Sequence, residues 1–494
     1  MTFASALPWL VALPFAAAAL VPAVAARRPG RAAPFAIAVV ALCTALAAGA
    51  TVQLVREGPF SHAVGGFAAP LGIELRFDAF SAWVLPLMGL LLLILPYART
   101  YLEDTLPAAR RPPFYALVLA NAGGMAGFAL SGDLFNLFVF MEVVALSAYA
   151  LVAIGGGGLA AWAALKYLLI GAVSSLLMLL GVGMLFALTG SLDLHDVAAR
   201  LGGVPPFPVA VALGLLATSF LVKAALFPLH VWLPDAHAIA PSPVSAVLSG
   251  LVVKIGILGL LRLIQLGMTA EGVDLSGFHL VLTVLGSISI LMGAFLAMFQ
   301  DDIKLMLAYS TISNVGYIVL GLGLATPFAM IGGAVHVFNH ALIKTTLFLA
   351  AGTLIHATGL RTLGDLRGIA RTMPTSAAAL AIGAVSIVGI PPTAGFVCKW
   401  YIALGAFEAG RGAFGVVLVF GALFIFVYFV RMVNALYFRA PVRPEVERAR
   451  EAPWTMRGPV LILAALCLAM GVLAGLPIAV VEPTILDLLG VGGP

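Results

Sequence analysis

The chain has 494 residues, of which 62% are hydrophobic and 10% are charged, and its mean hydropathy is +1.13. This composition excludes a soluble globular protein. A net charge of +5 would suggest a nucleic-acid partner in a soluble domain, but most basic residues here lie in short loops between apolar segments. The positive-inside rule of membrane proteins explains that placement. We therefore expect a polytopic membrane protein with no nucleic-acid partner.

The N-terminal segment, MTFASALPWLVALPFAAAALVPAVAARRPG, is similar to a signal peptide in its A-V-A ending. However, no basic residue precedes its apolar stretch, and Arg27, Arg28 and Arg31 follow it. We interpret the segment as a first transmembrane helix whose N-terminus lies outside the cell.

Apolar stretches long enough to cross a hydrocarbon core of about 30 Å recur along the whole chain. They predict an all-α polytopic membrane protein with about fourteen spans. The spans lie near 3–25, 33–53, 78–98, 112–131, 133–154, 160–189, 206–231, 241–266, 277–299, 303–324, 328–356, 375–409, 412–438 and 457–483.

The positions of the basic residues test the orientation of the chain across the membrane. From an outside N-terminus, sixteen of them fall at cytoplasmic span ends, and only Arg56, Arg76, Arg200 and Arg411 fall outside. This split follows the positive-inside rule. It predicts a multi-pass protein of the inner (plasma) membrane with both termini outside and the lipid bilayer as its surroundings.

Five of the six lysines lie inside the predicted spans, whereas arginines lie in loops or at span ends, with Arg262 near enough to the end of its span to snorkel outward. A buried ammonium can lose its proton, but a guanidinium stays charged. The sequence therefore predicts a row of buried proton-exchange sites at Lys166, Lys223, Lys254, Lys344 and Lys399.

Glu142, in GDLFNLFVFMEVVALSAYALVA, is the only acidic residue well inside a span. A carboxylate is costly there without a partner. If Glu142 lies beside Lys223, each charge stabilises the other until something disturbs the pair, which makes the pair a candidate switch. The alternative is a permanent ion pair that only orients two helices.

Two long apolar segments are broken by proline. LVKAALFPLHVWLPDAHAIAPSPVSAVLSG contains Lys223, and SIVGIPPTAGFVCKWYIALGAF contains Lys399. Such breaks leave backbone groups that lipid cannot satisfy, so they line enclosed, often hydrated, cavities. Paired broken segments in corresponding halves indicate an inverted-repeat transporter with two discontinuous helices.

His336, His340 and Lys344 follow at i, i+4 and i+8 and share one face of a helix. A zinc site would need further ligands, and neither an HExxH motif nor a nearby carboxylate or cysteine supplies them, so we expect no metal. The two remaining interpretations are core histidines with satisfied hydrogen bonds and a hydrated proton relay, which we prefer.

Lys254 would extend the relay on a neighbouring helix, and three further residues, Lys166, Asp235 and His237, are candidates for an accessory proton path. The alternative for Lys166 or Lys254 alone is a snorkelling anchor. Asp235 and His237 would lie at the cytoplasmic end of the first broken helix and pass protons to bulk water. A turn with a helix-capping aspartate is the alternative there.

These motifs give the chain a resemblance to a known family, the antiporter-like, proton-conducting membrane subunits shared by respiratory complex I, membrane-bound hydrogenases and the multisubunit Mrp cation/proton antiporters. The resemblance is carried by FMEVVALSAY, KAALFPLHVWLPDAHAIAPSPVSAVLSGLVVKIG, HVFNHALIKTTLFLAAG and GIPPTAGFVCKWY, and it covers about residues 75 to 440. The loop GFVCKWYIALGAFEAG and the overall length look most like the D subunit of the Mrp antiporters.

The resemblance implies fourteen helices with two inverted five-helix repeats. The helices would divide into an N-terminal three at 1–110, a first repeat at 111–270, a second repeat at 271–440, and a C-terminal loop and helix at 441–494. A glutamate replaces the twelfth-helix lysine in some complex I subunits, so Lys399 argues against those. The functional residues of the family fall on Glu142, Lys223, Lys254, His336, His340 and Lys399.

By this resemblance we expect the proton-translocating subunit of a multisubunit Na⁺/H⁺ antiporter, with other membrane subunits as partners. Sodium rests on the resemblance alone. The alternative is a proton-pumping subunit of a complex I-like NADH:quinone oxidoreductase or a membrane-bound hydrogenase. No soluble domain is present to hold a nucleotide, flavin or iron–sulfur cluster, so we expect no cofactor and no enzymatic site of its own.

The expected mechanism holds a proton on Lys223, with its affinity set by Glu142. The proton then passes along Lys254, His336, His340 and Lys344 and leaves near Lys399. Two other classes remain as alternatives: a stand-alone solute transporter, which would purify without partners, and a structural subunit whose buried charges only hold helices together.

Overall fold

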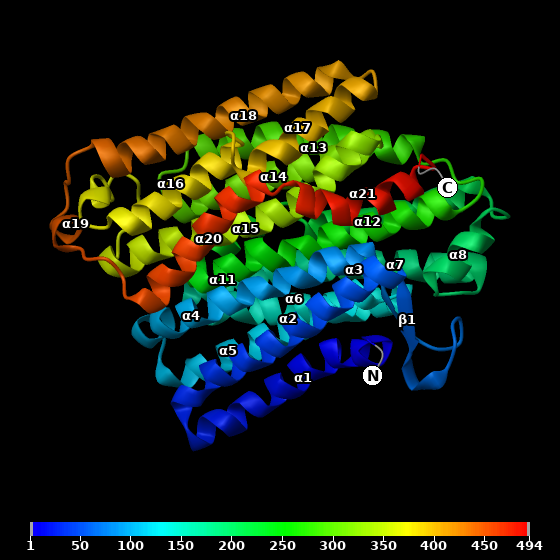
Figure 1. The fold of residues 1–494 in the computed structure, drawn as a ribbon, viewed down its shortest axis with the longest axis horizontal. Coiled ribbons are helices and arrows are strands. Elements are labelled where there is room, and N and C mark those ends of the chain that lie inside the picture. Colours follow the sequence, from blue (N-terminus) through cyan, green and yellow to red (C-terminus); the bar gives the residue numbers. More distant parts are fainter. Residues whose placement is uncertain (1–2, 492–494) are drawn as a thin grey trace.

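The computed structural model describes residues 3–491, and it is a bundle of long helices lying roughly side by side (Figure 1). Thirteen helices among the described residues are long and apolar enough to cross a membrane. The remaining predicted span, 375–409, is made of two shorter helices, α16 (Pro374–Val388) and α17 (Ala394–Glu408). The expected all-α, polytopic fold is confirmed.

The other elements follow the chain. They are α1 (Phe3–Arg27), α2 (Ala32–Glu57), β1 (Phe60–Ala63), β2 (Glu74–Phe77), α3 (Ala79–Val84), α4 (Leu91–Thr105), α5 (Arg111–Leu130), α6 (Leu134–Ala153), α7 (Gly158–Thr189), α8 (Leu194–Leu201), α9 (Pro206–Lys223), α10 (Leu233–Ile239), α11 (Ser242–Val247), α12 (Val253–Thr269), α13 (Ser276–Met298), α14 (Ile303–Leu324), α15 (Pro327–Thr358), α18 (Gly412–Val433), α19 (Pro444–Arg448), α20 (Trp454–Val472) and α21 (Gly475–Leu488).

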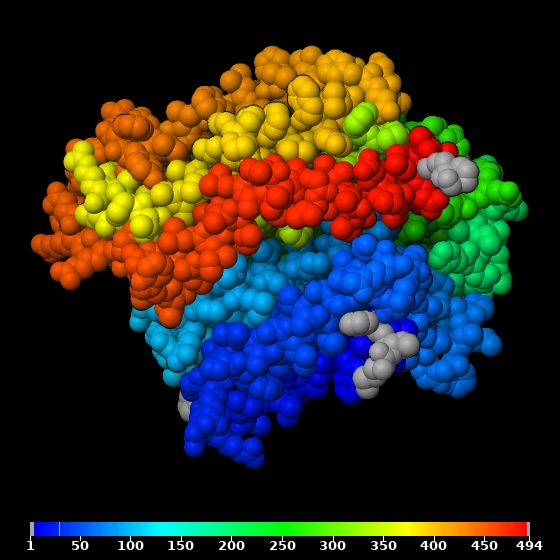
Figure 2. Space-filling model, in the orientation of Figure 1, coloured from blue at the N-terminus to red at the C-terminus, as the bar shows by residue number. Residues whose placement is uncertain are grey.

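The helices differ in how far they are buried. Nearly all side chains of α12, α14 and α15 are buried, whereas α1, α2 and α18 expose apolar side chains along their length. In the space-filling view, α20 and α21 cross one face between the N-terminal helices and α16–α18 (Figure 2). Since α12, α14 and α15 carry Lys254, Lys304, His336, His340 and Lys344, these polar side chains lie at the centre of the bundle.

Both predicted helix breaks are present. The helix α9 ends at Lys223, and irregular backbone leads to α10 at Leu233. One carbonyl released there, that of Val222, accepts a hydrogen bond of 2.9 Å from Trp232 Nε1. In the second break, Gly389 ends α16 with a φ of 89°, a conformation that favours glycine. At the first break a protein group thus satisfies freed backbone, as a hydrocarbon environment requires, whereas Ile390, Pro391 and Pro392 of the second break are exposed.

The chain termini lie at the same end of the bundle. The start of α1 and the end of α21 both lie on the right in Figure 1, at the end of the bundle that also carries the β1–β2 hairpin and α8. This arrangement agrees with an even number of spans. The assignment of that end to the outside of the cell stays a prediction, as does the division into repeats at 111–270 and 271–440.

An antiparallel hairpin interrupts the otherwise helical chain after α2. Its strands β1 and β2 pair Phe60 with Phe77 and Ala63 with Glu74. The sequence analysis predicted only helices and missed this hairpin, because each strand has four residues and is too short for a clear alternating pattern.

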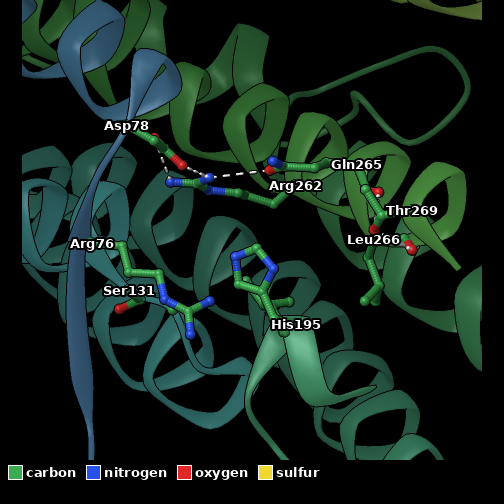
Figure 3. Close-up of a pocket in the computed structure, with 10 residues that line it drawn as sticks. Arg76, Asp78, Ser131, His195, Arg262, Gln265, Leu266 and Thr269 are labelled. Atoms are coloured by element: carbon green, nitrogen blue, oxygen red, sulfur yellow. Dashed lines mark hydrogen bonds and ion pairs between the residues drawn. The ribbon is translucent and has the colours of Figure 1, made fainter. Parts of the chain in front are cut away.

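The hairpin leads into a buried ion pair that corrects the interpretation of Arg262. Arg262 does not snorkel outward: its side chain is 5% exposed, and its guanidinium contacts the carboxylate of Asp78, the N-cap residue of α3. It also donates to the carbonyl of Ala129 at 3.2 Å and to Gln265 Oε1 at 3.1 Å. Figure 3 shows Arg262 pointing toward Asp78, with Arg76 and His195 lining the same small cavity.

We expect Arg262→Ala to destabilise the protein by about 3 kcal/mol, because removal of one partner leaves the other charge of a buried pair uncompensated. The measurement is the melting temperature of the purified protein. The matched control is Arg56→Ala, since Arg56 is exposed near the end of α2. Equal melting temperatures for Arg262→Ala and Arg56→Ala would contradict this structural role.

A carboxylate outside the membrane spans closes the N-terminus of α16. Glu451 accepts hydrogen bonds from the backbone amides of Thr375, at 2.6 Å, and Ser376, at 3.2 Å, and from the hydroxyl of Ser376 at 2.6 Å. Burial by itself would raise the pKa of Glu451, but these hydrogen bonds outweigh burial and hold its pKa below the ordinary value. The ionised form therefore anchors the segment before α20 to the positive end of the α16 dipole.

A depressed pKa in the folded state contributes stability above the ordinary glutamate pKa of about 4.3, and this contribution is lost as pH falls through the folded value. We expect Glu451→Gln to lower the melting temperature near pH 7, with the difference from wild type shrinking below about pH 4. Thermal unfolding followed across pH measures this. Glu447→Gln, on the exposed face of α19, is the control, and a pH-independent difference at Glu451 would refute the assignment.

Candidate functional site

The structure brings together the predicted pair of Glu142 and Lys223. Glu142 lies within α6, and Lys223 is the last residue of α9, at the break. The distance from Lys223 Nζ to Glu142 Oε1 is 3.3 Å, and the side chains are 6% and 26% exposed, respectively. The structure therefore places a partly accessible carboxylate against a lysine at a helix end.

Three uncharged groups complete the surroundings of Lys223. Its Nζ lies 3.3 Å from the hydroxyls of Tyr149 and Ser175 and 3.4 Å from the carbonyl of Gly171. The Ser175 hydroxyl also hydrogen-bonds Glu142 Oε1, so it bridges the two charges. We call these five residues the Glu142 cluster. The sequence analysis missed Tyr149 and Ser175, although Tyr149 follows Glu142 by two helical turns and so shares its face of α6.

Lys254 is held at the centre of the bundle without a carboxylate. It follows a π-helical turn, Leu248–Val252, and it is 0% exposed. Its Nζ contacts the carbonyl of Ser249 at 2.5 Å and His340 Nδ1 at 2.9 Å. A π turn opens the regular helical hydrogen-bond ladder, which leaves a carbonyl such as that of Ser249 available to a side chain. Lys254 therefore lies beside the histidine pair, as predicted, and contacts His340 directly.

The two histidines stack on one face of α15, with ring centroids 5.8 Å apart. His336 Nε2 lies 3.2 Å from Asn314 Oδ1, an acceptor, and His336 Nδ1 lies 3.0 Å from Cys398 Sγ. Both nitrogens of His336 thus have partners. His340 Nε2 has no hydrogen-bond partner among residues 3–491. The interpretation as a satisfied core histidine fits His336, whereas His340 retains a free nitrogen for proton exchange.

Lys344 belongs to the same helix but faces α14. Its Nζ donates to the carbonyl of Leu307 and to Ser310 Oγ, each at 2.8 Å. The side chain is fully buried. Within the described chain Lys344 makes no direct hydrogen bond to His340, so the shared helical face does not by itself create a continuous chain of contacts.

Lys399 lies on α17 just after the second break. Its Nζ donates to the carbonyls of Ile387, at 2.7 Å, and Val388, at 3.2 Å, which end α16. It also lies 4.4 Å from the ring centroid of Tyr317, a cation–π contact. The carbonyl end of a helix carries partial negative charge. The break therefore supplies the acceptors for this lysine.

The accessory residues lie differently from the expectation. Lys166 pairs with Asp235 at 2.7 Å, so two of the three accessory residues meet each other. Asp235 lies inside α10 and does not cap it. His237 is 0% exposed and stacks on Phe348 at 4.7 Å, so its predicted contact with bulk water is wrong. The helix α10 turns His237 inward because it packs against α14 and α11.

Lys304 is a further buried lysine, the one lysine that the sequence analysis did not place within a span. It is 4% exposed, and its Nζ donates to the carbonyl of Ala240 at the end of α10. Asp302, two residues earlier, caps α14 and pairs with Arg361 at 2.8 Å. The chain therefore places all of its lysines except Lys166 in largely protein-enclosed positions, and Lys304 lines a cavity together with Arg361 and Tyr101.

The site as a whole consists of amines and imidazoles: Lys223 and Lys166 are paired with carboxylates, and Lys254, Lys344 and Lys399 contact uncharged groups. Among residues 3–491, no group of three or more His, Cys, Asp or Glu side chains is arranged to hold a metal. No direct hydrogen bond between described residues joins the Glu142 cluster to Lys254. The chemistry available is protonation and deprotonation at separate buried positions, with one carboxylate able to bias one of them.

These features define a class: polytopic membrane proteins with two broken helices and titratable side chains buried along the centre. Residues 131–425 match the family model described as NADH:quinone oxidoreductase/Mrp antiporter, TM. The chain belongs to this family, which confirms the resemblance seen in its motifs.

Individual relatives include both types of complex. NADH-quinone oxidoreductase subunit N of Desulforudis audaxviator is 40% identical, over 86% of this chain and 88% of that protein. The D subunit of the Na⁺/H⁺ antiporter of Alkalihalophilus pseudofirmus is 33% identical, over 76% and 77%. A chain in the structure of the Mrp complex from Dietzia sp. DQ12-45-1b superposes with a TM-score of 0.91 at 27% identity, covering 99% of this chain and 98% of that one.

Proposed function

We propose that this chain is the proton-translocating membrane subunit of a multisubunit monovalent cation/proton antiporter, with Na⁺ as the coupled cation. The observation that carries the proposal is the contact between Glu142 and Lys223 at a helix break, because a carboxylate that moves toward or away from a buried amine controls whether that amine keeps its proton. Relatives named as antiporter subunits and an Mrp complex neighbour support the assembly with other membrane subunits.

In this proposal, Glu142 sets the proton affinity of Lys223. Protons then move between the separate buried positions, with the coupling on the scale of about 1.4 kcal/mol for each tenfold change in affinity. The chain is a transporter subunit without its own redox or ATP site, so the driving force comes from the partner subunits or the cation gradient. The residues of the proposed path are Lys223, Lys254, His336, His340, Lys344 and Lys399, with Lys166, Asp235 and His237 beside it.

A second candidate function is proton pumping in a complex I-like oxidoreductase or membrane-bound hydrogenase. It is favoured by the 40% identity to an NADH-quinone oxidoreductase subunit N and by a hydrogenase-4 component among the relatives. In that case the same buried residues would move protons, but electron transfer in partner subunits would drive them.

The test uses inverted membrane vesicles that contain the whole complex. We expect added Na⁺ to collapse a preformed pH gradient in wild-type vesicles, with K⁺ and Li⁺ as comparison cations, and we expect Glu142→Ala and Lys223→Ala to abolish this exchange at equal assembly. If cations have no effect but NADH or hydrogen oxidation acidifies the vesicles, the antiporter proposal is replaced by the second candidate. Cation exchange that persists in both variants would contradict the switch mechanism.

A further inference from the structure

An apolar groove lies on the membrane-facing surface between α16 and α18. Its volume is about 390 Å³, and its lining is apolar except for Asn434. The two helices are in contact, and α18 runs along the outer edge of the bundle (Figure 1). Val385 and Val388 line the groove on α16. Phe426 lines it on α18, and Phe438 lines it on the π-helical turn that follows α18.

The length of the groove matches one lipid chain. From Phe426 to Phe438 the α18 side advances by 12 residues, which corresponds to about 18 Å of helix. One leaflet of a bilayer core that is about 30 Å thick has a depth of about 15 Å. An acyl chain can therefore lie in the groove from the end of α18 to the middle of the membrane.

The end of the groove at Phe438 carries unpaired positive charge. The amide of Gly368 donates to the carbonyl of Ala435 at 3.0 Å, which places Arg367 and Arg371 beside the turn Asn434–Phe438. Arg439 follows directly. All three arginines are exposed, and none forms an ion pair with another residue of the described range 3–491. Arginines at this depth attract anionic lipid headgroups.

The inner end of the groove lies against the second helix break. Val388 lines the groove with its side chain, while its carbonyl accepts a hydrogen bond from Lys399. Ile390, within the break, is 38% exposed and also lines the groove. Irregular backbone at membrane depth must keep its polar groups paired within the protein, since hydrocarbon cannot satisfy them. An ordered chain here would keep water and disordered lipid from the carbonyls that hold Lys399.

We propose that the α16–α18 groove binds an anionic phospholipid, with one acyl chain along Phe426–Phe438 and the phosphate against Arg371 and Arg439. The apolar length and the unpaired arginines at one end together select this occupant. The binding is a property of the surface and does not depend on which ion the complex transports.

The experiment incubates the whole complex in nanodiscs with phosphatidylglycerol or phosphatidylcholine that carries a diazirine in the acyl chain, and it maps the labelled peptides after irradiation. We expect labelling of 384–390 and 426–438 that favours phosphatidylglycerol. Each arginine near the surface contributes roughly fivefold in affinity. The double substitution Arg371→Gln and Arg439→Gln should lower the preference for phosphatidylglycerol by more than about tenfold, and Val385→Trp should reduce labelling by both lipids.

Matched controls are Arg411→Gln, at the opposite end of α18, and Val419→Trp, which is exposed on α18 outside the groove. Neither should change the pattern. Equal labelling by both lipids in the wild type would overturn the proposal. So would disulfide crosslinking of Val433→Cys to another subunit in place of lipid labelling, because a partner helix would then occupy the groove. Transport is not the readout, so failure here and failure of the proposed antiport are distinguishable.

Discussion

Lys223→Arg is expected to abolish proton-coupled transport while the complex still assembles. Arginine keeps the positive charge and can still pair with Glu142, so the helices α6 and α9 remain joined. A guanidinium does not release its proton under ordinary conditions, whereas a lysine does. The substitution therefore separates the switch interpretation from that of a structural ion pair, which Lys223→Ala cannot do.

Glu142→Gln is the companion variant. It removes the carboxylate that lies 3.3 Å from Lys223 and leaves a buried ammonium uncompensated. Breaking such a pair costs about 3–5 kcal/mol, and each 1.36 kcal/mol is a factor of ten, so we expect exchange to fall by more than about a hundredfold. Some of this loss can come from reduced assembly, and the measured rate is therefore divided by the amount of assembled complex.

The measurement is the rate of cation-dependent pH-gradient collapse in inverted vesicles. Glu408→Gln is the matched control, because Glu408 is an exposed glutamate at the end of α17. Wild-type rates in Lys223→Arg would show that this lysine never gives up its proton during transport and that the pair only holds helices together.

The second large effect is expected at Lys254. Lys254→Met removes the amine from the centre of the bundle, where it contacts Ser249 O at 2.5 Å and His340 Nδ1 at 2.9 Å. Methionine has a similar length and no charge, so the fully buried site tolerates it. We expect normal assembly and transport near background, because the proton path loses the amine that contacts His340.

Lys254→Arg tests whether the amine exchanges protons or only donates hydrogen bonds. The guanidinium can donate to both acceptors but stays charged, so we expect it to fail as well. Leu258→Met, one turn further along α12 and equally buried, controls for the change in packing. Transport that persists in the methionine variant would remove Lys254 from the proposed path and leave His340 as an isolated core histidine.

Parts of the candidate site were predictable because charged side chains are rare within apolar membrane spans. Glu142 and the intramembrane lysines stand out since a charged side chain in an apolar span needs a functional or structural reason. The broken helices were predictable from proline for a similar reason. Periodicity placed His336 and His340 on one face of a helix, and their rings stack at 5.8 Å.

Other features could not be predicted because they depend on contacts between distant segments. Arg262 is paired with Asp78, 184 residues away, so its local position near a span end was misleading. Lys304 follows Asp301 and Asp302, which indicate a loop, yet its amine is buried against the carbonyl of Ala240 at the end of α10. The partners of Lys223 come from α6 and α7, and His237 turns inward only because α10 packs against α14 and α11.

The sequence by itself determined that this is a membrane protein, roughly where its spans lie, which titratable residues lie within them, and the family to which it belongs. These properties are local: hydropathy, proline and an isolated charge act within a single span. Only the tertiary structure decided which groups meet, because hydrogen-bond partners are set by helix packing. It joined Lys223 to Glu142 through Ser175, gave Lys399 the carbonyl end of α16, and left gaps between the clusters that proton transfer would have to cross.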